Sequence, residues 1–282
     1  MRYIDTSNLT ASLPPNWEDK TTAALDAART IASDDSLSCE EKRKAISQSL
    51  AKPKYGSKSP WSRIKEDLKQ MSGGTCWYCE SRLRGSYGAV DHFRPKNGVH
   101  GNAEHLGYWW LAFSPRNFRF SCDLFNTSGK GTLFPLCNEE SRCYCEGDPL
   151  PGEQPMLLDP VKRGDPELLE FLPNGEVVPA HRVGIDSRQR ERAEVTIEVL
   201  LLRHPDRVEG RLDVWETIKK RIRDGVFFLA QMGSGDNQAE ERFRELVEEL
   251  VAMVKPGAEF SATARAALVT EANEVDWLAP IL

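Results

Sequence analysis

The feature that most constrains this chain is a C-x-x-C pair, in which Cys76 and Cys79 stand two residues apart. That spacing lets two thiolates bind one metal ion from a tight turn, and a structural zinc ion then needs two further ligands. Cys122 is the natural third ligand. The fourth would come from one of three later cysteines, Cys137, Cys143 or Cys145, or the zinc is incompletely held or absent. We take Cys137 as the first candidate and leave the fourth position open.

A thiol redox pair is the rival interpretation of the same two cysteines. Such a pair opens a helix after a strand in a βαβ unit, and the flanking sequence does not supply that setting. The first twenty residues have no basic start followed by an apolar core, so they do not read as a secretory signal. No apolar run approaches the roughly 20 residues of a membrane span. We therefore expect a cytoplasmic protein with no membrane partner and no disulfide framework.

Charge is distributed unevenly along the 282 residues, whose formal net charge is −6. Residues 1–70 carry +2, residues 71–136 carry +3 and residues 137–282 carry −11. A positive balance around a candidate metal site suits a polyanionic substrate, whereas the acidic remainder would repel one. The charge pattern therefore directs a polyanionic substrate to the middle of the chain.

Helical patterns dominate outside the centre. Ser38 and Glu41 form a capping-box pattern that predicts a helix to about Leu50. Ser59-Pro60 suits an N-cap followed by proline at the first helical position, so a helix is expected over 61–71. Further helices are expected over five alanine-rich or apolar-periodic stretches, 21–33, 188–202, 211–232, 238–254 and 261–272.

Two short patterns predict strands in the connection that follows the centre. Asn174-Gly175 is a two-residue hairpin signal between the apolar runs EFL and EVV. The sequence PMLLDP, residues 155–160, also reads as a short strand. Within 211–232 one apolar face is expected to be buried, and it comprises Leu212, Trp215, Ile218, Ile222, Phe227 and Phe228.

A second group of residues in the centre suits phosphodiester chemistry. His92 follows the strand-like GAV and can accept a proton from water, because its ordinary pKa lies near neutrality. Asp91 is a hard oxygen ligand of the kind that Mg²⁺ prefers, and Asn126 offers a second oxygen. Lys130 is a point charge for phosphate, and Asn117 could orient the imidazole. Each residue alone has a purely structural interpretation, but their order and spacing favour a site.

Four cations are candidates for phosphate contacts, which position a nucleic acid without reading its sequence: Arg94, Lys96, Arg116 and Arg119. Taken singly, each could equally be a solvated surface charge. The aromatic run 108–110 and Phe113 could stack on bases, but burial preferences for aromatic side chains favour core packing.

The order of these motifs, C-x-x-C, D-H, N and C-x-x-x-N-x-x-x-K, resembles HNH endonucleases of the ββα-metal type. The longer sequences CWYCE, DHFRPK, GYWWLAF and KGTLFPL resemble the PtuB-like nuclease component of Septu anti-phage defence, which also occurs in retron-linked defence. The likeness runs from about residue 74 to 203. That family usually has a cysteine three positions after the one matching Cys122, where this chain has Phe125.

The resemblance implies a concrete fold and organisation. The fold would be α+β and mostly helical, with a central ββα-metal module that carries a zinc knuckle. The parts would be an N-terminal helical or docking segment (1–70), the HNH module (71–136), a loop and short-strand connection (137–185) and an acidic helical region (186–282).

The resemblance also implies a function, metal-dependent hydrolysis of DNA. His92 would be the general base, Asp91 and Asn126 would hold Mg²⁺ or Mn²⁺, and zinc would be structural. The implied partner is an ABC/SMC-like ATPase (PtuA-like). Two alternatives from other classes stay open: a non-catalytic zinc-containing adaptor that binds nucleic acid or protein, and a thiol redox protein.

Overall fold

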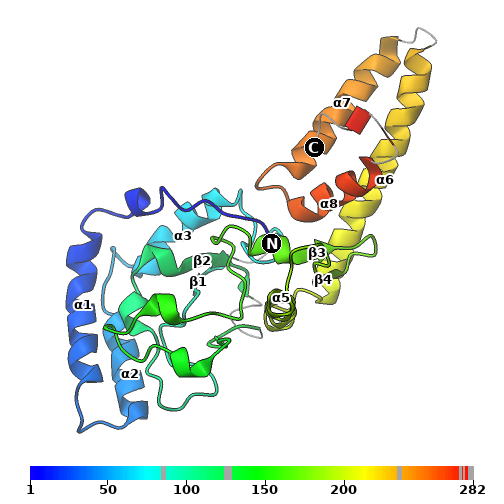
Figure 1. Ribbon diagram of the computed structural model, residues 1–282. Coiled ribbons are helices and arrows are strands. Elements are labelled where there is room, and N and C mark those ends of the chain that lie inside the picture. The colour runs from blue at the N-terminus through cyan, green and yellow to red at the C-terminus, as the bar shows by residue number, and fades with distance from the viewer. Residues whose placement is uncertain (84–86, 124–128, 234–236, 273–274, 276, 279–282) are drawn as a thin grey trace. The chain divides into compact units, whose positions relative to one another are not determined.

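The computed structural model describes the chain apart from residues 84–86, 124–128, 234–236, 273–274, 276 and 279–282 (Figure 1). The described part is mostly helical and divides into two compact units. The β1–β2 unit consists of Tyr3–Met71 and Leu83–Arg163. The β3–β4 unit consists of Met1–Arg2, Ser72–Arg82 and Gly164–Leu282. Each unit therefore combines segments that are distant from one another in the sequence.

Among its described residues, the β1–β2 unit contains a two-stranded antiparallel sheet and the three α-helices α1, α2 and α3 (Figure 1). Strands β1 (Ala89–His92) and β2 (Phe118–Ser121) pair with Ala89 opposite Ser121 and His92 opposite Phe118. Helices α1 (Trp17–Ala32) and α2 (Cys39–Leu50) pack against each other, and α3 (Pro60–Met71) packs on both strands. This packing brings α3 next to the end of β1, where the Asp-His pair lies.

Local capping explains where these helices begin. Ser38 accepts from the Glu41 backbone, and the Glu41 carboxylate accepts from the Ser38 backbone, so the capping box of α2 is confirmed. At α3 the Ser59 hydroxyl accepts from the Ser62 amide at 3.1 Å, and Pro60 is the first helical residue. Helix α1 begins at Trp17, four residues earlier than the alanine-rich stretch alone predicts.

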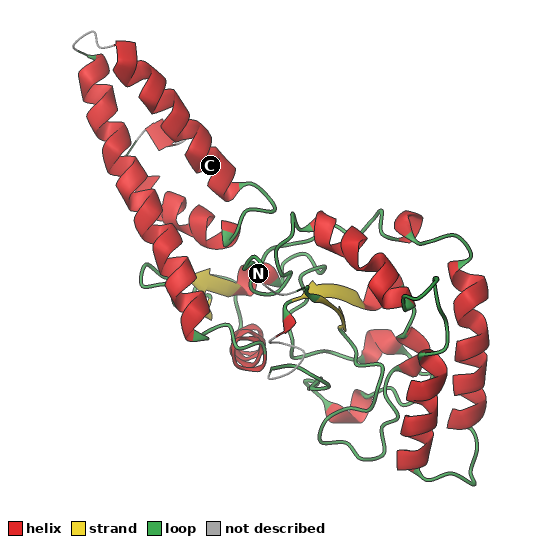
Figure 2. Ribbon diagram, turned by 180° about the vertical axis from the view of Figure 1, so that it is seen from behind, coloured by secondary structure: helices red, strands yellow, loops and turns green. Residues whose placement is uncertain are grey.

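In the part of the β3–β4 unit that the structure describes, there are a hairpin and four α-helices, and Figure 2 shows α6 and α7 side by side. Strands β3 (Leu169–Phe171) and β4 (Val177–Pro179) pair across the predicted Asn174-Gly175 turn, where Gly175 has φ 80°. A Cβ at Gly175 would collide with a backbone carbonyl of α6, so glycine is required there. The helices are α5 (Ser187–Val199), α6 (Pro205–Met232), α7 (Asn237–Val254) and α8 (Ser261–Ala272).

The core of this unit lies between α6, α7 and α8. Trp215, Ile218 and Ile222 of α6 are buried in it as predicted. Phe227 is 59% exposed and Leu212 is 36% exposed, so the assignment of these two residues to the buried face is wrong. The reason is geometric: Phe227 and Phe228 are adjacent and point to different sides of α6, and only Phe228 packs against the core.

Residues 137–168, which follow the centre of the chain, are largely irregular in structure. Residues 155–160 do not form the predicted strand: Met156, Leu157 and Leu158 are buried, but only Pro155 makes a bridge, to Leu136. The apolar side chains of this run are therefore explained by their burial in the core and do not indicate a strand. Short 3-10 helices lie at Thr10–Ser12, Trp109–Leu111, Pro115–Asn117, Glu139–Ser141, Leu150–Gly152 and Pro166–Leu168.

A two-stranded sheet, β1 and β2, lies in the part of the chain for which a ββα module is predicted. The helix of that module would fall on a stretch that includes residues 124–128, outside the described part of the chain, so the complete ββα-metal module remains a prediction. A membrane-spanning helix, long and apolar throughout, does not occur among the residues that the structure describes.

Candidate functional site

His92 is held at the end of β1 by one backbone carbonyl and two aromatic rings. Its Nε2 lies 2.9 Å from the Ala112 oxygen. A carbonyl oxygen only accepts, so Nε2 carries the proton and Nδ1 keeps its lone pair. The imidazole meets Trp61 and Phe118 edge to face, with ring centroids 5.5 and 5.4 Å apart. The ring is therefore fixed in one orientation and one tautomer.

Burial also sets the protonation state of His92. It holds the pKa of this imidazole well below its ordinary value, and the nearby charges of Lys96 and Lys130 lower the pKa further. Only the hydrogen bond to the Ala112 carbonyl acts in the other direction. The ring is consequently neutral near pH 7, the state in which it can accept a proton.

Asp91 is buried beside His92 and pairs with Lys130. The Lys130 ammonium donates to Asp91 Oδ1 at 3.0 Å and to the His92 carbonyl at 2.7 Å. Lys130 is only 2% exposed, so its charge is directed at these two protein acceptors. This corrects the expected role of Lys130 as a phosphate contact: in this structure it anchors the Asp91-His92 backbone and compensates the carboxylate.

Asn117 does not contact the imidazole, contrary to the sequence prediction. Its Oδ1 accepts from the Arg94 amide at 2.8 Å, and its Nδ2 donates to the Arg94 carbonyl at 2.9 Å. The Asn117 carbonyl accepts from the Phe93 amide at 2.9 Å. Asn117 therefore fixes the chain just after His92, and the Ala112 carbonyl takes the ring-orienting role that the sequence assigned to the amide.

Two of the four candidate phosphate-binding cations form internal ion pairs instead. Arg119 is buried, and its guanidinium donates twice to Asp159, at 2.7 and 2.6 Å. Arg94 donates to the buried Glu153 at 2.7 Å and lies over the ring of Phe134. Both assignments are therefore corrected to structural pairs, because a buried carboxylate requires a paired cation.

The other two cations remain available. Arg116 is exposed. The Lys96 ammonium lies 4.8 Å from the centre of the Trp61 ring and, among the described residues, makes neither a hydrogen bond nor an ion pair. Burial lowers the pKa of Lys96, Asp91 raises it and Lys130 lowers it. Lys96 borders a polar pocket of about 120 Å³ that Asp91, His92 and Thr132 also line.

The site also depends on a residue that the sequence did not single out. The Trp61 indole Nε1 donates to the Ala112 oxygen at 2.7 Å, and its ring stacks on Phe113 at 5.3 Å. No local motif marks Trp61, because its partners lie about fifty residues away. The predicted metal ligand Asn126, like Phe125, lies outside the described residues.

The aromatic run in this part of the chain belongs to the core. Tyr108, Trp109, Trp110 and Phe113 are all buried, which confirms packing over base stacking. Tyr108 donates from its hydroxyl to the Glu153 carboxylate at 2.6 Å. The run therefore belongs to the packed interior and offers no open stacking platform.

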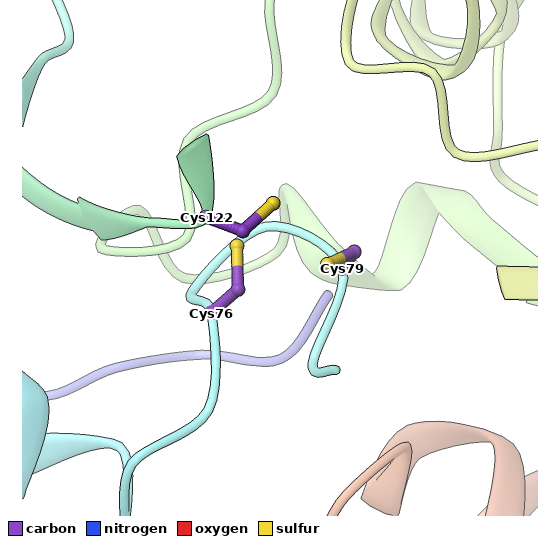
Figure 3. A group of neighbouring side chains, drawn as sticks. All are labelled: Cys76, Cys79 and Cys122. Carbon is purple, nitrogen blue, oxygen red and sulfur yellow. The ribbon is translucent and has the colours of Figure 1, made fainter. Parts of the chain in front are cut away.

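Cys76, Cys79 and Cys122 form a second candidate centre (Figure 3). All three are buried, and their sulfur atoms lie within 4.8 Å of one another. The Glu80 amide donates to the Cys76 carbonyl at 2.9 Å, and the Cys76 amide donates to the Ser81 carbonyl at 3.0 Å. These bonds close the tight turn that presents both thiols. Three converging thiols are soft donors of the kind that zinc takes, so the cluster could hold a metal ion.

Cys137 does not join this centre, so its assignment as fourth ligand is wrong. Its Sγ donates to the Met156 sulfur at 3.3 Å. Neither Cys143 nor Cys145 belongs to the three-thiol group either. Burial and Glu153 raise the pKa of the Cys143 thiol to about 11, which suits an inert buried thiol. Within the described ranges, no fourth protein ligand accompanies the three cysteines.

No family model matches the sequence. The chain is 31% identical over 202 residues to the Septu protein PtuB of Bacillus mycoides (strain KBAB4). The aligned region covers 67% of this chain and 65% of that protein. The chain therefore spans slightly less than two thirds of the length of the relative that it matches.

Proposed function

Since the chain belongs to the PtuB-like Septu family, we propose that it is a metal-dependent HNH endonuclease that hydrolyses phosphodiester bonds of DNA in anti-phage defence. The observation that carries the proposal is the state of His92. Its Nε2–H bonds to the Ala112 carbonyl, and its Nδ1 lone pair is left to act as a base, beside a buried carboxylate. A neutral, oriented imidazole next to Asp91 is the arrangement that general-base hydrolysis needs.

His92 performs the proton transfer in this proposal. Its Nδ1 takes a proton from the attacking water, and the resulting positive charge is shared with the Ala112 carbonyl through Nε2–H. Because the carbonyl and the flanking rings of Trp61 and Phe118 fix the ring, little reorganisation accompanies the transfer. The same burial that lowers the pKa of His92 keeps the base unprotonated before the reaction.

The position of Asp91 suits a ligand of a hard divalent cation. The carboxylate lines a polar pocket, and carboxylate oxygens are the ligands that Mg²⁺ prefers. We propose that Asp91 and Asn126 hold Mg²⁺ or Mn²⁺ there. When bound, that cation would supply the charge stabilisation that the leaving oxygen requires.

Lys96 and Arg116 are the cations that we propose for the DNA backbone. Lys96 borders the pocket and Arg116 is exposed, whereas the other candidate arginines are engaged in internal pairs. A flexible ammonium suits a phosphate next to the scissile bond, and an exposed guanidinium suits one farther along the strand.

The three-cysteine centre is proposed as a structural zinc site. The Ser81 hydroxyl lies 2.9 Å from Cys79 Sγ and can donate to it when the sulfur is a thiolate. We further propose that a PtuA-like ATPase of the ABC/SMC type is the partner. Support for that partner comes from family membership and not from any contact of this chain.

The decisive experiment compares wild-type protein with His92→Ala in a plasmid-cleavage assay, with and without co-purified partner. A general base contributes about 10²–10⁴-fold, so the variant should lose at least about 100-fold of the cleavage rate while retaining its melting temperature within a few degrees. EDTA should abolish wild-type cleavage, and Mg²⁺ or Mn²⁺ should restore it.

His181→Ala is the matched control, because His181 is exposed and lies far along the chain from the pocket. It should cut like the wild type. Near-normal cleavage by His92→Ala would remove the assignment of the base. Absence of metal-dependent cleavage by the wild type, with its partner present, would reject the nuclease altogether.

A further inference from the structure

We propose that Trp61 of α3 is a positioning residue that fixes both the base His92 and the phosphate-binding cation Lys96. The inference rests on the proposed nuclease function and adds a residue from the N-terminal segment to its site. One indole makes three contacts that bear on the chemistry: a hydrogen bond, an edge contact with the imidazole and a cation–π contact.

The first contact is a hydrogen bond from Trp61 to the carbonyl oxygen that His92 also uses. The Ala112 oxygen accepts from Trp61 Nε1 at 2.7 Å and from His92 Nε2 at 2.9 Å. A carbonyl oxygen has two lone pairs, so these two donors satisfy it completely. Trp61 thereby holds the carbonyl in place for the imidazole and leaves no lone pair for a competing water. The tautomer of His92 is fixed as long as this carbonyl stays in place.

The second contact confines the imidazole itself. Trp61 meets the ring of His92 at an interplanar angle of 80°, and it is stacked on Phe113 at 6° with centroids 5.3 Å apart. Phe118 meets the imidazole from β2 at 84°. The indole is thus clamped by Phe113 and closes one side of the cage around His92. Ring rotation would require Trp61 or Phe118 to move.

The third contact concerns Lys96. Its ammonium lies over the Trp61 ring, and no described carboxylate pairs with it. A cation over an indole face is attracted by the ring quadrupole, and the attraction is stronger where water is excluded. The half-buried Lys96 is therefore kept at the edge of the pocket, pointing at the same space as His92 and Asp91. One side chain fixes the distance between base and phosphate ligand.

The placement of Trp61 follows from the start of α3. Ser59 caps the helix and Pro60 occupies its first position, so Trp61 stands in the first turn, where the backbone is already fixed. Helix α3 in turn packs on β1 and β2, the strands that carry His92 and Phe118. The helix thus delivers the indole to the site as a rigid element.

The test uses Trp61→Phe and Trp61→Leu, with Trp17→Phe as the matched control. Trp17 is a buried tryptophan of the same unit, whereas Trp61 is half-buried, and Trp17 Nε1 donates to the next carbonyl, that of Phe113, at 3.1 Å. Trp17→Phe therefore removes the same kind of hydrogen bond one residue away from Ala112. Cleavage of a short duplex gives kcat and KM, and ¹⁵N shifts of labelled histidine rings report the tautomer of His92 without any reaction.

Trp61→Phe keeps a ring and loses the donor, so kcat should fall about fivefold with KM nearly unchanged, because about 1 kcal/mol of hydrogen bonding is removed. Its His92 should show a mixture of tautomers. Trp61→Leu also removes the face under Lys96, so KM should rise several-fold in addition. Trp17→Phe should lower the melting temperature while kcat and the His92 shifts stay at wild-type values.

Two results would overturn the inference: wild-type kcat and an unchanged tautomer in Trp61→Phe, or an equal loss of kcat in Trp17→Phe. Failure of the proposed function is a separate result. If the wild type does not cut DNA, the nuclease proposal is lost, while the ring shifts of Trp61→Phe still decide whether Trp61 fixes His92.

Discussion

Arg119 and Arg116 lie three residues apart in the sequence, but the side chain of Arg119 is buried and that of Arg116 is exposed to solvent. Arg119 is 2% exposed, pairs through two nitrogens with Asp159 and donates to the carbonyls of Arg116 and Phe118. Removing one partner of such a pair leaves a buried charge uncompensated. Arg116 is exposed, and its charge is solvated. Arg119 therefore contributes to the stability of the fold, and Arg116 can contact a ligand at the surface.

We predict opposite outcomes for the two substitutions. Arg119→Gln should lower the free energy of unfolding by about 3–5 kcal/mol in urea denaturation. Arg116→Gln should change it by less than about 0.5 kcal/mol. Arg116→Gln should also weaken DNA binding. The slope of the logarithm of the DNA association constant against the logarithm of salt concentration should become shallower by about 1, because one phosphate contact is lost. Weakened DNA binding by a fully stable Arg119→Gln would contradict the assignment of Arg119 as a structural pair.

The turn that carries Cys76 and Cys79 is the element that contributes two thiols to the cluster that could hold a metal ion. Within residues 72–82, backbone bonds close the turn around Cys76 and Cys79, and Glu80 takes a left-handed conformation with φ 63°. The Glu80 carboxylate accepts from the Ser261 hydroxyl and the Ala262 amide at the start of α8. The turn is therefore anchored from both sides, and the thiols are presented on a rigid support.

We predict that the purified protein carries zinc that depends on Cys79 and not on Cys137. Cys79→Ser should lose most of the zinc measured by elemental analysis and should melt at a lower temperature, because metal binding contributes to folding. Cys137→Ser should keep both properties, since its sulfur contacts Met156 instead. Equal zinc loss in the two variants would show that the ligand set differs from the three-thiol cluster.

At the scale of the whole molecule, buried polar groups make stability depend on pH. His105 is fully buried: Nε2–H donates to the Cys143 carbonyl, and Nδ1 accepts from the Gly107 amide, both at 2.9 Å. Burial lowers the pKa of His105. Arg142 lowers it too, whereas the bond to Cys143, Glu153 and Glu139 raise it. The rings of Tyr108 and Tyr144 also face the imidazole.

The sign of this pH dependence follows from proton counts. Below about pH 6.5 the unfolded chain binds a proton at His105 and the folded chain does not, so stability falls as pH is lowered. One group contributes at most about 1.4 kcal/mol per pH unit. Denaturation of the wild type and His105→Gln between pH 7.5 and 5 should give a flatter profile of unfolding free energy against pH for the variant. Parallel profiles would exclude His105 as the titrating group.

Local signals in the sequence determined where two of the helices begin and where the β3–β4 hairpin turns. The Ser38 capping box, the Ser59-Pro60 start and the Asn174-Gly175 turn each act over two to four residues, and the structure confirms all three. Asp91 and His92 were placed correctly at the end of a strand for the same reason. These signals need only neighbouring backbone groups, so they can be read without the fold.

Tertiary structure alone decided which partner each polar side chain of the site takes. Lys130 pairs with Asp91 across 39 residues, and Trp61 reaches the Ala112 carbonyl across 51. Such choices depend on which acceptor is buried unpaired when helix and sheet pack, because burial makes an unmet hydrogen bond costly. The sequence therefore singled out His92 and its neighbouring carboxylate Asp91, while packing of α3 on the sheet supplied the indole and the carbonyl that hold the imidazole.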